Sequence, residues 1–198
     1  MPFDSVRKFE KTIATYAGSK YAVAVDSCSN ALFLACLYVD MKGQTVTIPA
    51  RTYPSVPAAI IHAGAKVKFV DQEWSGVYGL DPYPIIDGAK RFTKDMYVKG
   101  SYHCLSFHAK KHLPIGRGGM ILTDDKDAYE WFKLARFDGR EECALTDQES
   151  FSVLGWNFYM NPEQASRGLW LFGMIADDNA DLVEDPPYPD LSKHKVFS

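Results

Sequence analysis

Short apolar runs alternate with helix-like stretches along the first 70 residues of the chain. Each run is four or five residues long, and the stretches before and between the runs have the apolar spacing or the length of helices. Strands that are joined through helices can pair in parallel, so this order predicts an α/β domain with a mainly parallel sheet and helices on its faces. Strands are expected at residues 21–25, 45–48 and 66–70, and helices at 6–16, 31–39 and 55–63.

The remaining elements follow from the same patterns. Asp4 or Ser5 is expected to cap the first helix, and Gly18 is expected to end it. From residue 177 the chain becomes acidic and rich in proline, so residues 1–176 are expected to form one domain and residues 177–198 an extended tail. Further strands are expected at residues 85–86, 102–107 and 120–122, and further helices at 125–136 and 162–175.

The composition excludes several classes of protein. With 198 residues, 46% of them hydrophobic, and a net charge of −3, the chain resembles an ordinary globular domain. Its Lys and Arg residues are scattered, which gives no reason to expect a nucleic-acid partner. No apolar run approaches the ~20 residues that cross a bilayer, so no membrane partner is expected. The four cysteines lie far apart and are expected to be reduced thiols in a cytoplasmic protein.

Polar and aromatic side chains follow several of the predicted strands. Ser27 and Ser29 precede a helix start, where free backbone amides favour an anion such as phosphate, and the alternative is that Ser29 is only a helix cap. Asp87 ends a short apolar strand and suits either a helix cap or a protonated ring nitrogen. Tyr53 follows a strand that ends at Pro49, where its ring can lie on a planar cofactor or pack in the core.

Lys111 lies between an apolar strand and a glycine cluster at residues 116–119. Glycines allow close backbone approach, and a lysine beside them suits an amine that holds a carbonyl group as an imine. Lys110 is a rival, but neighbours on an extended segment point to opposite faces, so only one of the two can reach a given site. A phosphate cradle, an aromatic ring, a carboxylate and a lysine, all at strand ends, are the parts that a pyridoxal phosphate (PLP) site needs.

Seven segments follow one another in an order that resembles a known family. They are residues 9–25, 27–32, 49–53, 64–71, 87–89, 106–111 and 155–165. The resemblance is to the DegT/DnrJ/EryC1/StrS aminotransferases, which are fold type I PLP-dependent enzymes. It implies a PLP-dependent transferase large domain in truncated form.

Five of these segments imply a role for their residues. The run Ser-Cys-Ser-Asn-Ala-Leu is similar to the family's SGTxAL turn, which implies that Cys28 and Ser29 bind the cofactor phosphate. The run Pro-Ala-Arg-Thr-Tyr is similar to PSxTF, which implies that Tyr53 stacks on the pyridine ring. The run Asp-Gly-Ala-Lys is similar to EDAAQ, which implies that Asp87 holds the ring nitrogen and that Lys90 replaces a glutamine near the ring hydroxyl.

The last two segments imply the reactive group and a second subunit. The run from Ser106 to Lys111 is similar to SFxxxK, which implies that Ser106 binds the phosphate and that Lys111 is the Schiff-base lysine. The run Gly-Trp-Asn-Phe-Tyr-Met is similar to GYNYRM, whose asparagine reaches the phosphate of the neighbouring subunit. This resemblance assigns that role to Asn157 and implies a homodimer with shared active sites.

The chain also departs from the family pattern. Cys28 replaces a glycine, Lys90 a glutamine and Tyr159 an arginine. Only residues 82–84 stand where relatives carry a long helix–strand–helix passage, and the small C-terminal domain is largely missing after Ile175. The chain is therefore expected to be a reduced large domain.

The resemblance implies an aminotransferase that moves an amino group from an amino acid, glutamate by family habit, to a nucleotide-linked keto-sugar through a Schiff base on Lys111. Two alternatives stay open: a PLP-binding protein without transaminase activity, in a regulatory or assembly role, and a PLP-dependent dehydratase. Candidates for the substrate diphosphate or the donor carboxylate are Arg51, Arg117, Arg136 and Arg140.

A metal site is the alternative from another class of function. His103, Cys104, His108 and His112 crowd one segment, but no HExxH pattern is present, and a strand followed by a loop does not give helical ligand spacing. No metal is therefore expected.

Overall fold

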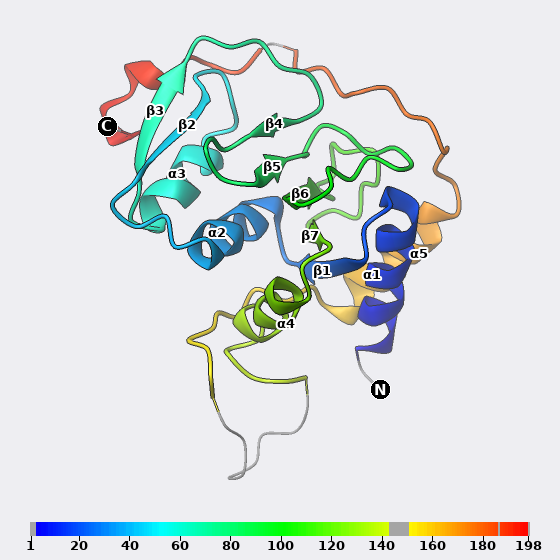
Figure 1. Ribbon diagram of the computed structural model, residues 1–198. Coiled ribbons are helices and arrows are strands. Elements are labelled where there is room, and N and C mark those ends of the chain that lie inside the picture. The colour runs from blue at the N-terminus through cyan, green and yellow to red at the C-terminus, as the bar shows by residue number, and fades with distance from the viewer. Residues whose placement is uncertain (1–2, 143–150, 186, 198) are drawn as a thin grey trace.

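The computed structural model describes residues 3–142, 151–185 and 187–197. Its main sheet has five strands in the order β1-β7-β6-β5-β4, and a separate pair is formed by β2 and β3 (Figure 1). The strands of the main sheet are β1 (Tyr21–Val25), β4 (Tyr78–Gly79), β5 (Ile85–Asp87), β6 (Tyr102–Ser106) and β7 (Gly119–Thr123). The pair consists of β2 (Thr45–Pro49) and β3 (Lys66–Val70).

The sheet is mixed, and its directions bring three strand ends to one edge. Strands β5 and β6 pair in parallel, while β7 is antiparallel to both of its neighbours, so β1, β5 and β6 all run in the same direction. Strands β2 and β3 also pair in parallel. Thr47 of β2 and Asp81 exchange two backbone hydrogen bonds of 2.8 and 3.1 Å, which connect this pair to the segment after β4. The expected α/β class is confirmed, but the main sheet is mixed and not mainly parallel, because β4 and β7 run against their neighbours and make three of its four strand pairings antiparallel.

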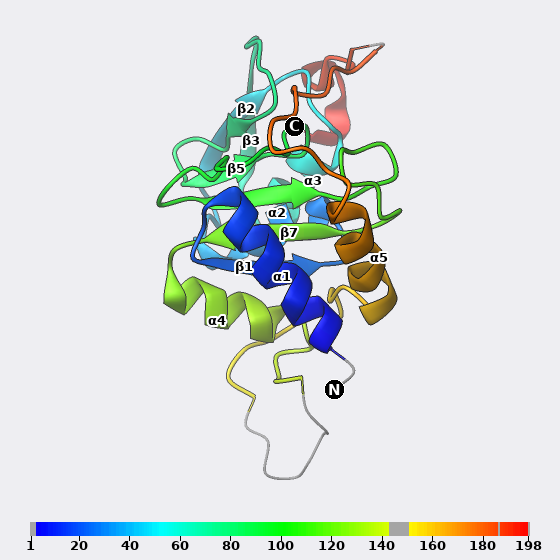
Figure 2. The same cartoon turned by 90° about the vertical axis from the view of Figure 1, so that its right-hand side faces the viewer.

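Helices cover both faces of the main sheet. Helices α1 (Asp4–Ala17) and α5 (Pro162–Phe172) lie side by side on one face (Figure 2). The other face packs against α2 (Cys28–Tyr38) and α4 (Lys126–Ala135), while α3 (Ser55–His62) packs against α2 and β3. The alternation along β1 explains both contacts, because Val23 and Val25 join the core under α2 and α4, whereas Ala22 and Ala24 join the core under α1.

Two helices begin earlier than the sequence suggested. Helix α1 already includes Asp4, and its N-cap is Phe3, which makes no side-chain cap, so the expected capping by Asp4 or Ser5 is wrong. Gly18 ends α1 in the left-handed conformation as expected, with a φ of 85°. Helix α2 begins at Cys28 rather than at residue 31, because the Oγ of Ser27 accepts the N–H of Asn30 at 3.2 Å and starts the helix.

The chain after α5 returns across the sheet edge. Figure 1 shows it (orange to red) running from α5 back toward the β2–β3 pair. Two backbone hydrogen bonds of 2.9 Å hold this return, from Leu182 N–H to the carbonyl of Lys90 and from Leu191 N–H to the carbonyl of Ala50. Two short 3-10 helices follow, η1 (Leu191–Lys193) and η2 (Lys195–Phe197). No helix in the described part of the chain has the length and apolar character needed to span a membrane.

Candidate active site

Three of the predicted site residues lie where β1, β5 and β6 end. Asp87 is the last residue of β5 and Ser106 the last of β6, while Cys28 opens α2 shortly after β1. Because these three strands run in the same direction, their carboxyl ends share one edge of the sheet, which is where α/β folds bind ligands.

Gly119 in β7 packs directly against the turn that begins α2. A Cβ on Gly119 would lie 2.3 Å from the carbonyl carbon of Ser27 and 2.5 Å from the nitrogen of Cys28, so only glycine fits at this place in β7. The first N–H groups of a helix have no acceptor within it, and they carry the positive end of the helix dipole. The turn from Ser27 to Ser29 is therefore a built place for an anion such as a phosphate.

The serines near this turn have specific partners. Ser27, not Ser29, is the N-cap of α2, so the alternative reading of Ser29 as a cap is wrong. The hydroxyl of Ser29 instead bonds to the hydroxyl of Ser55 at the start of α3, at 2.7 Å. Ser106 is half-buried, and its hydroxyl accepts a long bond of 3.4 Å from the N–H of His108. The hydroxyls of Ser29, in the first turn of α2, and Ser106, at the end of β6, thus belong to two elements at the same edge of the sheet.

Asp87 is buried and hydrogen-bonded, with 5% of its surface exposed. Its two carboxylate oxygens accept the phenol of Tyr78 at 2.8 Å and the N–H of Ala89 at 2.9 Å. Burial raises the pKa of Asp87, whereas those two hydrogen bonds and the charges of Lys111 and Lys90 act in the opposite direction. The carboxylate caps no helix among the described residues, and a cationic partner would relieve the burial of its charge.

Lys111 belongs to the same cluster of charges. Burial and the charge of Asp87 raise the pKa of the Cys28 thiol, and the charge of Lys111 lowers it, so these three side chains lie within electrostatic reach of one another. The segment is a turn, closed by a 2.9 Å bond from Lys111 N–H to the carbonyl of His108, so the argument from an extended segment is wrong. The turn nevertheless separates the two lysines, because Lys111 is half-buried and Lys110 is exposed.

Lys90 is buried between aromatic rings. Its Nζ lies 5.0 Å from the ring centre of Trp74 and 4.5 Å from that of Tyr188, and 3.4 Å from a carboxylate oxygen of Glu184. Only 7% of its surface is exposed, so Lys90 does not face solvent. Tyr53 is 57% exposed and is therefore not a core residue, and its ring centre lies 6.2 Å from that of Tyr188.

Asn157 bonds to residues outside this cluster. It is exposed, and its amide donates to the carboxylate of Asp138 at 3.1 Å. Its backbone pairs with Phe137 beyond the end of α4. The expectation that Asn157 acts across a subunit boundary stays a prediction.

The arginine candidates have different surroundings. Arg136 is 1% exposed and binds the carboxylates of Glu10 and Glu142, so it is a core residue and not a ligand for substrate. Arg117 pairs with Asp26 at 2.7 Å beside the α2 turn, and it is exposed. Arg51 reaches the backbone carbonyl of Tyr188 at 3.4 Å.

The histidines do not assemble into a metal site in the described part of the chain, where no group of three or more His, Cys, Asp or Glu residues could hold an ion. His103 is fully buried, its Nε2 has no hydrogen-bond partner, and burial lowers its pKa to about 4. His112 instead contacts the carbonyl of Ala180 at 2.8 Å.

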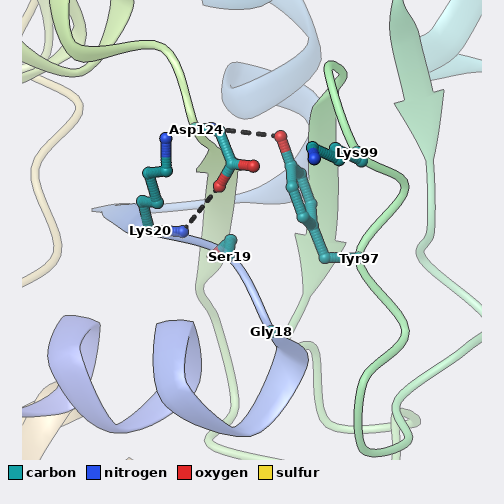
Figure 3. Close-up of a pocket in the computed structure, with 6 residues that line it drawn as sticks. All are labelled: Gly18, Ser19, Lys20, Tyr97, Lys99 and Asp124. Carbon is teal, nitrogen blue, oxygen red and sulfur yellow. Dashed lines mark hydrogen bonds between the residues drawn. The ribbon is translucent and has the colours of Figure 1, made fainter.

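A pocket of about 390 Å³ lies at the opposite edge of the sheet (Figure 3). It is found where β1 begins and β7 ends, and the carboxylate of Asp124 there accepts the N–H of Lys20 at 2.8 Å. None of the predicted site residues contributes to it. Its lining residues are Gly18, Ser19, Lys20, Tyr97, Lys99 and Asp124.

Four contributors to the site were missed from the sequence: Trp74, Tyr78, Glu184 and Tyr188. Nothing in the local pattern around Tyr78 marks it as a partner of Asp87. The acidic and proline-rich run that holds Glu184 and Tyr188 was read as an extended tail, with no expectation that it would return to the site.

Comparison with known proteins adds the family. The model of the DegT/DnrJ/EryC1/StrS aminotransferase family matches residues 2–85 and 88–180. Asp87 falls between the two matched blocks, and the chain from residue 181 onward lies beyond them. The role of Asp87 therefore depends on its geometry more than on this match.

Individual relatives match most of this chain and about half of their own length. The spore coat polysaccharide biosynthesis protein SpsC of Bacillus subtilis (strain 168) is 26% identical over 211 residues, which cover 84% of this chain and 50% of that protein. GDP-perosamine synthase of Caulobacter vibrioides is 26% identical over 205 residues, with 82% and 54% covered.

A solved structure matches the fold. The crystal structure of AtS13 from Actinomadura melliaura superposes with a TM-score of 0.72 at 20% identity, and the match covers 85% of this chain and 59% of AtS13. The family model covers most of the sequence and this superposition most of the fold. The chain belongs to the DegT/DnrJ/EryC1/StrS aminotransferase family.

Proposed function

We propose that this protein is a PLP-dependent aminotransferase that passes an amino group from an amino acid, glutamate, to a nucleotide-linked keto-sugar. The observation that carries the proposal is the cluster of half-buried Lys111, buried Asp87 and the N-terminal turn of α2 at the carboxyl edge of the sheet. The nucleotide-sugar substrate is supported by family membership and by a relative named for a GDP-linked product.

The donor set fits the cofactor at three points. The free amides of Cys28 and Ser29 suit a phosphate, and the hydroxyl of Ser106 at the end of β6 lies on the same edge of the sheet. The carboxylate of Asp87 suits a protonated ring nitrogen, and the amine of Lys111 suits an aldehyde carbon. PLP, when bound, supplies an electron sink for the bond changes at the donor α-carbon.

Asp87 keeps a proton at the ring nitrogen. Its carboxylate is fixed from one side by the phenol of Tyr78 and the N–H of Ala89, at 2.8 and 2.9 Å. A cation placed against it gains a strong charge-assisted hydrogen bond, because the site is buried and the competing solvent is excluded.

Lys111 binds and then moves a proton. Its amine would hold the aldehyde carbon of a bound cofactor, and when free it would carry a proton away from the donor α-carbon. The turn closed by His108 holds Lys111 toward the site, while Lys110 points to solvent. This difference makes Lys110 the matched control for every test of Lys111.

The test is a visible spectrum of the purified protein with added PLP, and then with glutamate. We expect a band that borohydride fixes to the protein and that glutamate bleaches, present in Lys110→Ala and absent in Lys111→Ala. A band that glutamate leaves unchanged would favour a PLP-binding protein without transaminase activity or a dehydratase acting on another substrate. A band that persists in Lys111→Ala would remove Lys111 from its role.

We propose further that the protein acts as a homodimer in which Asn157 serves the site of the partner subunit. Asn157 is exposed and contacts Asp138 rather than the cluster of its own chain. The test mixes Lys111→Ala with Asn157→Ala protein, each inactive alone. Mixed dimers regain an intact site only if the two residues come from different subunits, whereas no activity returns if Asn157 serves its own chain.

A further inference from the structure

A segment of the chain crosses the candidate site and is tied down at both ends. We name residues 181–185 and 187–191 the strap. At its first end, Asp181 receives two hydrogen bonds from the guanidinium of Arg91, at 2.7 and 2.6 Å, and one from the hydroxyl of Ser75 at 2.9 Å. Leu182 adds its backbone bond to Lys90. This end is therefore fixed next to Lys90 itself.

The second end of the strap is buried. Leu191 is 2% exposed, and its N–H donates to the carbonyl of Ala50 at 2.9 Å. Beyond it, the ring of Phe197 lies against that of Phe69 on β3, with 6.4 Å between the ring centres. Between the two ends the chain has no helix or strand in its described residues, and Val183 is 89% exposed.

Two side chains of the strap turn toward the site residues. The carboxylate of Glu184 lies 3.4 Å from the Nζ of Lys90. The ring of Tyr188 lies between three predicted or observed site residues, with its centre 4.5 Å from the Nζ of Lys90, 6.2 Å from the ring of Tyr53 and 6.5 Å from the nearly parallel ring of Trp74. The strap therefore contacts the residues assigned to the cofactor ring and its hydroxyl.

The charges agree with this placement. Burial works to raise the pKa of Glu184, but the hydrogen bond from Tyr188 and the charges of Lys90 and Lys111 lower it overall. Burial raises the pKa of Tyr188, and the charges of Glu184 and Asp87 add to that effect. Both strap side chains are thus within electrostatic reach of the groups that the cofactor needs.

We propose that the strap is an internal competitor, in which Glu184 and Tyr188 take the place of PLP until the cofactor displaces them. The proposal rests on the proposed function, because the contested groups, Lys90 and Tyr53, are those assigned to PLP. A fixed wall of the site would leave the rings of Tyr53 and Trp74 free for a ligand, whereas here Tyr188 lies against both.

The contacts between the anchored ends are weak enough to be displaced. The side chain of Glu184 is 37% exposed, and an ion pair of this kind shifts an equilibrium by no more than about fivefold. Removing a competitor raises the apparent affinity for the ligand by a factor equal to the reciprocal of the fraction of protein that the competitor leaves free. Loss of the strap contacts should therefore tighten PLP binding.

The first experiment measures the apparent dissociation constant of PLP by absorbance titration of full-length variants. Glu184→Gln should bind PLP about twofold to fivefold more tightly than the wild type, and Glu184→Gln with Tyr188→Ala about tenfold more tightly. Asp185→Asn is the matched control, because it removes one negative charge from an exposed position of the same strap. Equal or weaker binding in the Glu184 and Tyr188 variants overturns the proposal.

The second experiment follows amide hydrogen exchange in the wild-type chain with and without PLP. Displacement moves Glu184 away from Lys90 and should loosen the adjoining anchor, so exchange should speed up at Leu182, whose N–H bonds to the carbonyl of Lys90 at 2.9 Å. The N–H of Tyr97 makes a hydrogen bond of the same length, 2.9 Å, to the carbonyl of Ala17, and it lies away from the site. Its exchange rate should not change. Equal protection of Leu182 in both states overturns the proposal.

The outcomes separate the two hypotheses. If the wild type binds PLP, but the strap substitutions do not change its affinity and PLP does not change the exchange at Leu182, the competitor role of the strap is wrong and the proposed function stands. If only the strap variants bind PLP, both hypotheses are supported. If no variant binds PLP, the proposed function fails, and the competitor role fails with it.

Discussion

The carboxylate of Asp87 accepts a hydrogen bond of 2.8 Å from the phenol of Tyr78, and both side chains are buried. The same phenol shares a short hydrogen bond with the hydroxyl of Thr52. Tyr78 therefore connects the end of β5 to the loop after β2, and it holds Asp87 at the edge where the ligand is expected. The charge of Asp87 depends on this support, because the hydrogen bond from Tyr78 lowers its pKa against the effect of burial.

Tyr78→Phe is expected to lower the free energy of unfolding by about 1–3 kcal/mol at pH 7, because a buried carboxylate loses a donor. The direction in which stability changes with pH follows from the raised pKa of Asp87. An acid whose folded pKa is raised binds its proton more tightly when folded, so stability is lost as pH rises from the unfolded value of 3.8 through the folded pKa. Tyr78→Phe raises that pKa further, so its cost should shrink as the pH falls toward 3.8. Urea denaturation of the wild type and of Tyr78→Phe between pH 7 and pH 3.8 measures this cost.

The control for that prediction is Tyr83→Phe, which removes a hydroxyl from a half-buried ring packed against the same core. It should change stability little and without dependence on pH. Equal losses in the two variants, or a loss in Tyr78→Phe that is constant with pH, would contradict the role assigned to Tyr78.

His103 is expected to make the fold sensitive to mild acid. Its pKa is lowered by burial to about 4, with the charge of Arg91 adding to the effect, while in the unfolded chain histidine keeps its ordinary pKa of 6.5. The unfolded state therefore binds the proton more readily, and the stability present above pH 6.5 is lost as the pH falls toward 4. Between pH 7 and pH 5 the loss is about 2 kcal/mol.

His103→Gln removes this titration and keeps an acceptor for the N–H of Val98, which bonds to the ring Nδ1 at 3.4 Å. The quantity to measure is the difference in unfolding free energy between the two proteins at each pH. That difference should favour the wild type at pH 7 more than at pH 5. Parallel pH curves would show that His103 does not carry the sensitivity.

Regular elements of the fold were predictable where the pattern is local. Strands β1 and β3 begin and end at the residues expected, because their apolar runs are bounded by Gly18 and Gly64 on one side and by Asp26 and Asp71 on the other. The start of α2 was missed by three residues, since the polar run after Val25 reads as a turn although its first serine caps a helix. Strand β4 has only two residues, too few to form a pattern.

The site was predictable only in part, for a similar reason. Asp87 and Lys111 come at strand ends, and their position along the chain indicates one edge of a sheet. The partners of Asp87 and Lys90 lie elsewhere in the sequence: Tyr78 is nine residues from Asp87, and Glu184 reaches Lys90 from the far end of the chain. Such contacts arise from the packing of the whole fold and leave no local signal.

Gly119→Ala is expected to damage the α2 turn. The added methyl group would lie 2.3 Å from the backbone of Ser27, which cannot move without shifting the first turn of the helix. We expect a loss of about 1–3 kcal/mol in unfolding free energy together with weaker PLP binding.

Gly173→Ala is the matched control for this change. Gly173 has a φ of −62°, and the atom nearest to an added Cβ would be the carbonyl oxygen of Trp170 at 3.4 Å. The substitution should therefore be neutral or stabilising by about 0.4–1 kcal/mol. Thermal unfolding and a PLP titration of both variants test the prediction. If Gly119→Ala keeps the stability and PLP affinity of the wild type, the turn from Ser27 to Cys28 can move to accept the added methyl group, and the prediction is wrong.

Arg136 and Glu10 form a buried ion pair that joins α4 to α1, and the same guanidinium binds the carbonyl of Ala24 in β1 and the carboxylate of Glu142. Arg136→Met leaves Glu10 as a buried charge without its partner, which is expected to lower the unfolding free energy by about 3–5 kcal/mol. Arg7→Met is the matched control, because Arg7 also binds Glu142 at 2.7 Å but is 43% exposed, and its loss should cost about 0–1 kcal/mol. Urea denaturation of the two variants measures the contrast. If Glu10→Met in the Arg136→Met background restores the lost stability, the cost comes from the stranded carboxylate; if it does not, the guanidinium itself supports the joint between α1, β1 and α4.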